Sequence, residues 1–208
     1  MSEQRNLPRL TLPPIAGEQT EERLQAVTIG ALQPLIGKIV IADYDARWPE
    51  LYATEAAQIR AALGERALSL EHVGSTSVPG LPAKPLIDIL LVVADTTDEA
   101  AYVPPLEGAG YALRLREPDW YQHRMLKGFD PEVNLHVFNP DCEETRRMLL
   151  MRDWLRANPA DRDLYARTKR ELAAREWKYM QNYADAKGAV VHEILSRAIA
   201  ASDAEETA

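Results

Sequence analysis

The segment Leu86–Val93 reads Leu-Ile-Asp-Ile-Leu-Leu-Val-Val and restricts the fold more than any other part of the sequence. A strand with one wet face alternates apolar and polar residues, whereas a strand buried on both faces is almost continuously apolar. The segment therefore predicts a strand inside a sheet that is covered on both sides. Its one acidic residue, Asp88, needs a cation, a metal or hydrogen-bond donors, because an unpaired buried carboxylate is costly.

The other predicted elements place strands early and helices late. Strands are expected at Lys38–Asp43, Ala67–Gly74, Tyr111–Arg116, Arg124–Phe129 and Val133–Phe138, the last three antiparallel. Helices are expected from Pro49 to Gly64, in a short piece that begins near Pro104 and Pro105 and closes at Gly108, twice after Pro140, and at Val190–Ile199. Asn158 is the expected cap of the second of the two helices after Pro140. This order predicts an α/β (α+β) fold in which helices pack on a mixed β-sheet and form the C-terminal portion.

The length of 208 residues suits a single domain with short extensions. Residues 1–37 hold several prolines and are expected to form an N-terminal arm, with a short helix at Thr20–Val27. Residues 38–200 form the predicted domain. Residues 201–208 are acidic and small, and are expected to be a frayed tail.

Charge and composition exclude several classes of protein. The net charge of −8 argues against a nucleic-acid binder, because such proteins carry a basic face that neutralises phosphates. Cys142 is the single cysteine, so neither an internal disulfide nor a metal-thiolate cluster is possible. No run of about 20 apolar residues suggests a membrane span. We therefore predict a cytoplasmic protein that binds neither membranes nor nucleic acid, and leave its oligomeric state open.

One stretch carries most of the chemistry. It runs from His72 through Val-Gly-Ser-Thr-Ser-Val-Pro-Gly-Leu-Pro-Ala-Lys to the buried strand. Gly74 permits a close backbone approach or a positive φ, and the hydroxyls at 75–77 can cap a helix or bind phosphate oxygens. Lys84 adds a positive charge and Asp88 a negative one. This order indicates a phosphate-binding loop beside an acidic group.

The residue types alone leave other interpretations open. The three hydroxyls can simply cap a helix, while Asp88 pairs with Lys84 or Arg124. A hydrolase triad can also be drawn from Ser75, a histidine at 72 or 136, and Asp88, but the Gly-x-Ser-x-Gly sequence of a nucleophile elbow is absent. His72, His123 and His136 can each be a metal ligand or a hydrogen-bonded residue at a strand end.

The stretch His72–Val93 resembles the signature of the GrpB family, whose members share Gly-Ser-Thr-Ser-Val-Pro-Gly-Leu-x-x-Lys-Pro-x-Ile-Asp-Ile. Similar residues continue along the chain and cover about Lys38 to Ala200. They are Asp43-Tyr44-Asp45, Trp48-Pro49, Leu135-His136-Val137, Met151–Leu155, Asn158-Pro159, Tyr165, Tyr183 and Lys187. A match of this length is specific.

The resemblance implies the nucleotidyltransferase fold and its chemistry. In that superfamily an acceptor attacks the α-phosphate of a nucleotide, while Mg²⁺ held by carboxylates neutralises the developing charge. The implied ligand is a nucleotide or another phosphorylated small molecule. The implied phosphate-binding residues are Gly74, Ser75, Thr76, Ser77, Lys84, Arg124 and Lys187. Asp88 is implied as the Mg²⁺ ligand and, together with His136, as a catalytic residue.

The sequence departs from the superfamily pattern at the carboxylates. Leu90 stands where a second acidic residue is expected, and the later strand offers Asn134, His136 and Phe138 on one face. One carboxylate of three is present, although each Mg²⁺ needs several oxygen ligands. GrpB-like domains are also fused to dephospho-CoA kinases, where they are thought to assist folding. A non-catalytic module of that kind is therefore the alternative, and without a Gly-x-x-x-x-Gly-Lys-Ser/Thr loop this chain is not itself such a kinase.

Overall fold

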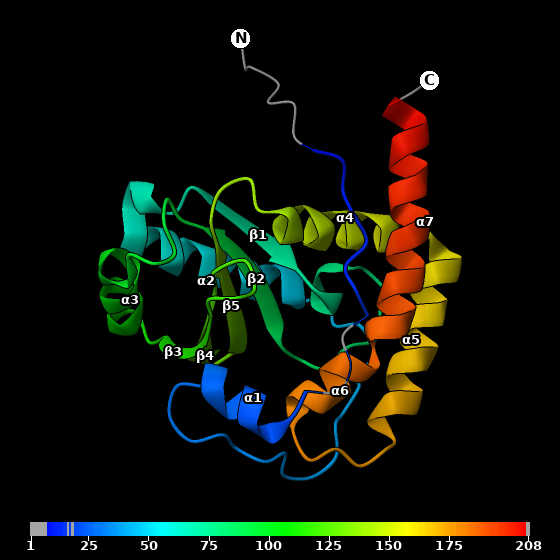
Figure 1. The fold of residues 1–208 in the computed structure, drawn as a ribbon, viewed down its shortest axis with the longest axis horizontal. Coiled ribbons are helices and arrows are strands. Elements are labelled where there is room, and N and C mark those ends of the chain that lie inside the picture. Colours follow the sequence, from blue (N-terminus) through cyan, green and yellow to red (C-terminus); the bar gives the residue numbers. More distant parts are fainter. Residues whose placement is uncertain (1–7, 16, 18, 207–208) are drawn as a thin grey trace.

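The computed structural model describes residues 8–15, 17 and 19–206. Five strands form one sheet in the order β1-β2-β5-β4-β3 (Figure 1). They are β1 (Ser69–Val73), β2 (Ile87–Val92), β3 (Ala112–Glu117), β4 (His123–Phe129) and β5 (Glu132–Phe138). β2 and β5 run parallel and the other neighbours antiparallel, so the sheet is mixed.

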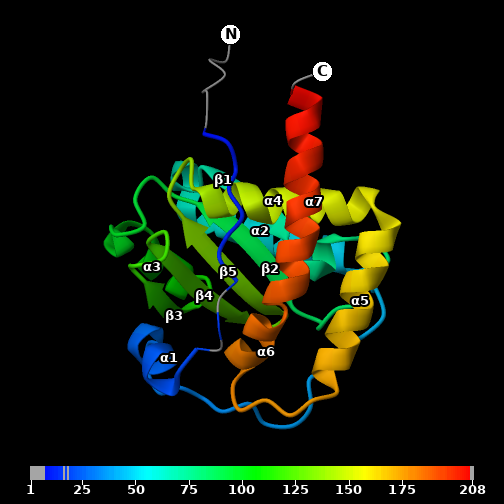
Figure 2. The same ribbon diagram turned by 45° about the vertical axis from the view of Figure 1, so that its right-hand side comes forward.

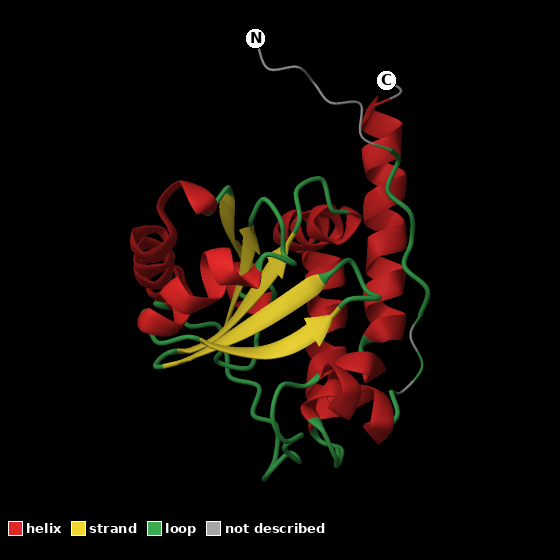
Figure 3. Ribbon diagram, turned by 60° about the vertical axis from the view of Figure 1, so that its left-hand side comes forward, coloured by secondary structure: helices red, strands yellow, loops and turns green. Residues whose placement is uncertain are grey.

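Helices cover both faces of the sheet, as the apolar run in β2 requires (Figure 3). α2 (Trp48–Leu63) and α3 (Glu99–Gly108) pack on one face, where Ile59 and Leu106 meet Ile89 in the main core. α4 (Glu143–Ala157) packs on the other face, where Met148 lies against Leu90. The mixed α/β fold with a helical C-terminal portion is confirmed.

The remaining helices lie around the sheet. α1 (Glu21–Val27) confirms the short helix predicted at Thr20–Val27, and the hydroxyl of its N-cap, Thr20, accepts a hydrogen bond from the Arg23 amide. α5 (Pro159–Ala173), α6 (Met180–Ala186) and α7 (Gly188–Glu206) follow α4, and α7 stands beside the sheet as the longest helix (Figure 2). Two 3₁₀ turns, η1 (Gly64–Arg66) and η2 (Ser75–Ser77), border β1.

The predicted strand at Lys38–Asp43 is wrong. In this segment Ala42 forms an isolated bridge with Ala83, and the backbone is otherwise irregular. Ile39 is buried and Ile41 partly buried against a cluster with Leu172 and Tyr183 of the C-terminal helices. The apolar side chains therefore find their burial against helices, without joining the sheet.

The predicted start of the helix at the two prolines is also wrong, because α3 begins at Glu99 and contains Pro104 and Pro105 in its interior. A proline inside a helix leaves a carbonyl four residues earlier without its partner. Arg66 compensates by donating from Nη1 to the Ala101 carbonyl at 2.8 Å. A tertiary contact thus stabilises a helix that local sequence disfavours.

The two chain ends differ from expectation in detail. α7 continues to Glu206, beyond the expected end of helical structure at Ala200.

The helix cap predicted at Asn158 is not formed. Asn158 stands at the start of α5, but its side chain donates to the Trp154 carbonyl of α4 and does not cap α5. Outside α1 and a bridge between Thr28 and Leu115, the described part of the arm is irregular, and Thr11 hydrogen-bonds to Glu143 of α4. Within the described residues no helix combines the length and apolar character needed to cross a membrane.

Candidate functional site

Strand register gathers polar side chains in one row across the α4 face of the sheet. Asp88 of β2 pairs with Asn134 of β5, and Asn134 pairs with Lys127 of β4. In the next row Leu90 pairs with His136. Because side chains alternate between faces along a strand, Asp88, Asn134 and His136 share one face. This agrees with the face predicted for Asn134 and His136 from the sequence.

Asp88 is held by β5 and by neither Lys84 nor Arg124. The Asn134 amide donates to Asp88 Oδ1 at 3.0 Å, and His136 Nε2 lies 3.5 Å from the same oxygen. Burial raises the pKa of the Asp88 carboxyl, but its contacts with His136 and Asn134 and the charge of Lys187 outweigh burial and hold the pKa below its usual value. Asp88 is therefore an ionised carboxylate at neutral pH.

Gly74 makes room for this carboxylate. It has φ 67° and ψ −171°, a combination that only glycine adopts readily. A β-carbon at this position would lie 2.9 Å from both Cβ and Cγ of Asp88, and closer still to its Oδ2. The close backbone approach predicted for Gly74 exists, and the group that approaches is Asp88 itself.

Four lysines surround the site. Lys169 of α5 is 3% exposed, donates to Ser75 Oγ at 2.9 Å and also donates to the Pro82 carbonyl. Burial, together with the charges of Lys187 and Arg170, lowers the pKa of Lys169 to about 7, against the opposing effect of Asp88. Burial likewise lowers the pKa of Lys84, where Lys127 and Lys187 act in the same direction and Glu132 and Asp88 oppose it. A positively charged region thus lies beside the loop.

The structure divides the predicted loop hydroxyls into two kinds. Thr76 and Ser77 are buried, at 1% and 4% exposure, and their hydroxyls donate to the carbonyls of Leu86 and Gly74. These hydrogen bonds hold the loop together, and the phosphate-binding role of Thr76 and Ser77 stays a prediction. Ser75 is half-buried and contacts Lys169, which leaves it as the hydroxyl that faces the site.

Arg124 was predicted at the phosphate rim, but it lies on the opposite face of the sheet. Its Nε donates to Glu99 Oε1 of α3 at 2.7 Å, and Arg124 is 6% exposed. The physical reason is the alternation along β4, which sends Lys127 to the Asp88 face and Arg124 away from it. We therefore exclude Arg124 from the candidate site.

We expect Arg124→Met to lower stability and leave anion binding unchanged. Removing a buried hydrogen-bonded charge should cost roughly 1–3 kcal/mol, because Arg116 is then the one ion-pair partner left to Glu99 among the described residues. Urea denaturation measures this loss. The control is Arg116→Met, whose half-exposed side chain should contribute less than about 1 kcal/mol. Weaker phosphate binding in a folded Arg124→Met protein would contradict this assignment.

Residues 38–197 match the family described as GrpB protein. The chain belongs to the GrpB family. A UPF0157 protein of Halalkalibacterium halodurans is 59% identical over 180 residues, which cover 86% of this chain and 92% of that protein. The crystal structure of the conserved protein GrpB from Enterococcus faecalis shares 30% identity with a TM-score of 0.70, over 78% of this chain and 99% of that one.

The GrpB family also relates this chain to a longer enzyme. A dephospho-CoA kinase of Mycolicibacterium paratuberculosis is 30% identical over 158 residues, which cover 63% of this chain and 39% of that protein. The predicted family, its extent along the chain and its relation to dephospho-CoA kinases are all confirmed.

The residues at the GrpB site do not fit a resident Mg²⁺ ion. Such an ion takes several oxygen ligands, usually including carboxylates. Asp88 Oδ1 already accepts from Asn134, and four lysines oppose a further positive charge. In the described part of the chain, no three side chains of His, Cys, Asp or Glu are grouped to hold a metal. The sequence-based prediction of Mg²⁺ therefore gains no support from the donor set.

His72 lies apart from this site. It stacks on Tyr52 of α2 with ring centroids 4.7 Å apart, and its Nε2 is 3.1 Å from Thr76 Oγ1. Burial lowers its pKa to about 4, and Asp88 opposes that effect. His72 is thus a neutral residue of the α2 face, where its hydrogen bond to Thr76 supports the loop.

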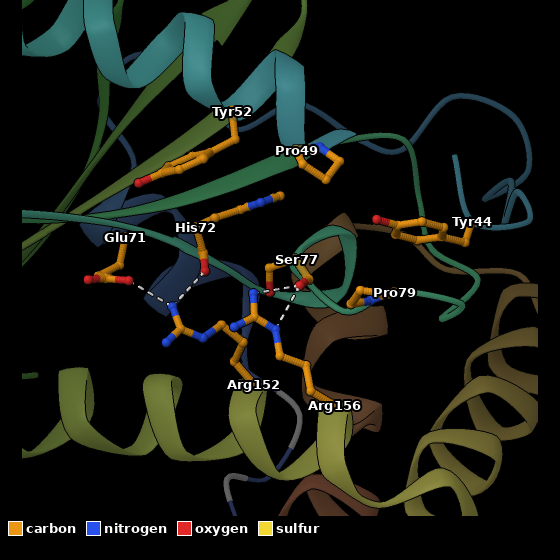
Figure 4. A pocket seen from close by; sticks show the side chains of 9 residues that line it. All are labelled: Tyr44, Pro49, Tyr52, Glu71, His72, Ser77, Pro79, Arg152 and Arg156. Atoms are coloured by element: carbon orange, nitrogen blue, oxygen red, sulfur yellow. Dashed lines mark hydrogen bonds and ion pairs between the residues drawn. The ribbon is translucent and has the colours of Figure 1, made fainter. Parts of the chain in front are cut away.

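A cavity of about 360 Å³ lies at the β1 edge of the sheet, where residues of α2, β1, the loop and α4 line it (Figure 4). Arg152 and Arg156 of α4 reach into its wall and hold the loop at both ends (Figure 4). Arg152 donates to the His72 carbonyl at 3.1 Å, and Arg156 donates to the Ser77 carbonyl from two nitrogens. The two arginines therefore join α4 to the loop, which the sequence alone did not indicate.

Proposed function

We propose that this protein binds a nucleotide or another phosphorylated small molecule on the α4 face of the sheet, beside Asp88. The observation that carries the proposal is the buried Lys169, which contacts Ser75 and lies near Lys187 in a chain of net charge −8. Burying an amine beside other cations is unfavourable unless an anion compensates. A phosphate group supplies that charge.

The proposed contacts follow from the geometry. A protonated lysine has three N–H donors, and Lys169 uses two of them for Ser75 and the Pro82 carbonyl. The third is available to a phosphate oxygen, while Lys84, Lys127 and Lys187 supply positive charge around it. A nucleotidyltransferase-like fold and a cytoplasmic location remain part of the proposal. Any Mg²⁺ belongs to the nucleotide as part of the substrate.

Calorimetric titration tests the proposal directly. We expect inorganic triphosphate and ATP to bind without added metal, and the affinity to fall as salt is raised, because exposed charges are screened at high ionic strength. Added Mg²⁺ should weaken binding of free triphosphate, because it neutralises charge that the lysines would otherwise meet. If no phosphate compound binds at low salt, the proposal fails.

A second function is favoured by the match to dephospho-CoA kinases. The chain matches a segment that makes up 39% of the Mycolicibacterium paratuberculosis kinase. An accessory module would act by docking on a kinase domain and assisting its folding. Such a module needs the fold of the sheet and helices but not the lysines.

Replacing Asp88 by Asn separates the two functions. Asparagine keeps the shape and removes the charge that interacts with His136 and Lys187. A phosphate-binding protein should change its affinity for triphosphate, whereas an accessory module should only lose stability. The docking function is measured separately, as recovery of a co-expressed kinase domain that lacks its own GrpB-like segment.

A further inference from the structure

A chain of four side chains runs across the sheet and ends at the candidate site. Glu117 Oε2 of β3 lies 2.6 Å from His123 Nδ1, and His123 Nε2 lies 3.1 Å from His136 Nδ1. His136 Nε2 then lies 3.5 Å from Asp88 Oδ1. The four residues come from four neighbouring strands, β3, β4, β5 and β2.

The first link fixes the direction of the whole chain. An ionised carboxylate only accepts hydrogen bonds, so His123 carries its proton on Nδ1 and donates it to Glu117. His123 is 3% exposed and stacks between His136 and Phe138, with centroid distances of 5.3 and 4.7 Å. Burial lowers its pKa to about 4, although Glu117 opposes the effect. His123 is therefore neutral near pH 7 and its Nε2 is a bare acceptor.

The second link then sets the tautomer of His136. Since His123 Nε2 accepts, His136 must donate from Nδ1. That leaves Nε2 of His136 toward Asp88. Without a proton there, two acceptors would face each other at 3.5 Å. A proton on Nε2 removes the repulsion between the two acceptors and places a hydrogen-bond donor beside Asp88, at the candidate site.

The other charges around His136 come from two further elements. Glu144 of α4 interacts with His136 and is bound by Arg147, 2.9 Å away. On the side of α6 and α7, Lys187 acts on Asp88. His136 therefore has Asp88 at its Nε2 and interacts electrostatically with a second carboxylate, Glu144, while Lys187 acts on Asp88.

We propose that His136 exchanges a proton through Nε2 with the anion bound at this site, and that Glu117 and His123 are positioning residues that fix its tautomer. The inference rests on the phosphate site proposed above. In the exchange, the Nε2–H bond breaks and an O–H bond forms on a ligand oxygen. A neutral imidazole protonated on Nδ1 remains, and the reverse step restores the proton.

The tautomer is measurable without any ligand. In protein labelled with ¹⁵N-histidine, the couplings between ring nitrogens and ring carbon-bound hydrogens identify the protonated nitrogen of each of the four histidines. We expect Nδ1 of both His123 and His136 to carry a permanent proton. In His123→Phe, His136 loses its acceptor at Nδ1, so its permanent proton should move to Nε2, toward Asp88. The Gln amide can either accept from or donate to His123 Nδ1, so Glu117→Gln should give a mixture of both tautomers at His123 and at His136.

A conservative variant and two internal references control the experiment. In His123→Gln, the amide oxygen can still accept from His136 Nδ1, and the wild-type tautomer should return. His72 and His192 are not part of the hydrogen-bonded series Glu117–His123–His136–Asp88, so their signals report whether each variant keeps its fold. An unchanged His136 tautomer in both folded variants, His123→Phe and Glu117→Gln, would overturn the positioning role.

Inorganic pyrophosphate tests the proton exchange. We expect its binding to shift the Nε2 signal of His136, and we expect His136→Phe to weaken binding roughly ten- to a hundredfold, as for loss of a charge-assisted hydrogen bond. If pyrophosphate binds with wild-type affinity to His136→Phe, the proton-exchange role is wrong while the anion site survives. If no phosphate binds to any form, the proposed function fails, and the tautomer result still decides whether Glu117 and His123 position His136.

Discussion

Gly74→Ala should destabilise the protein by roughly 2–5 kcal/mol, because two penalties act at the same position. The backbone at Gly74 has φ 67° and ψ −171°, which strains any residue that carries a β-carbon. The added methyl would also overlap the carboxylate of Asp88. In a domain of this size each kcal/mol lowers Tm by about 2–4 °C, so thermal melting measures the effect easily.

Gly80→Ala is the matched control for this prediction. Gly80 has φ 78°, and a β-carbon there would meet no atom within 4 Å. It should cost only the backbone strain, roughly 1–2 kcal/mol. Combining Gly74→Ala with Asp88→Ala should recover part of the larger loss, since the carboxyl group is then absent. Equal losses for the two glycine variants would show that Asp88 does not constrain the loop.

Lys169→Met should reduce the affinity for inorganic triphosphate roughly ten- to a hundredfold while leaving the fold intact. Methionine has a similar length and carries no charge, so it removes the donor to the ligand but fills the same space beside Tyr165, whose ring centroid lies 4.8 Å from Lys169 Nζ. Lys178→Met is the control, because Lys178 is exposed and pairs with Glu21. Isothermal titration calorimetry at low salt compares the three proteins.

Lys169 should also make triphosphate binding depend on pH, because its amine takes up a proton when the anion binds. With its pKa near 7 in the free protein, Lys169 is mostly neutral at pH 8. A bound anion favours the charged form, so triphosphate binding at pH 8 should take up protons. Titrations in buffers of different ionisation enthalpy measure this uptake. It should fall in Lys169→Met, and an unchanged uptake would contradict the assignment.

The pKa of Lys169 also predicts a pH dependence of stability. The folded value, about 7, lies below the ordinary value of 10.5, so the unfolded chain binds more protons between these limits. Stability contributed by this site therefore rises as the pH increases from about 7 to about 10.5. The difference in unfolding free energy between the wild type and Lys169→Met should follow this slope, because other titrating groups are common to both proteins.

The sequence was most informative where a local pattern has one physical solution. The apolar run at 86–93 had to be a strand covered on both faces, and it is β2 in the sheet interior. The alternating segments before Asn139 became β3, β4 and β5. Gly74 and Asp88 were singled out from chemistry alone, and the structure places them in contact.

The sequence-based predictions failed where a local pattern was compatible with two structures. In β4 both Met125 and Leu126 are apolar and buried, so alternation did not show which face Arg124 would take. The prolines at 104 and 105 argued against a helix that Arg66 stabilises from a distant segment. The sequence also did not show that the hydroxyls of Thr76 and Ser77 donate to carbonyls of their own loop.

What the sequence by itself determined was the buried strand, the glycine beside it and the need of Asp88 for partners, because these follow from burial and from the short-range geometry of the chain. Only the tertiary structure decided which partners Asp88 has and that Lys169, 94 residues from Ser75, completes the site. The strength of a charge interaction depends on the separation of the groups in space and not along the sequence. The packing of α5 against the loop is what brings Lys169 close to Ser75.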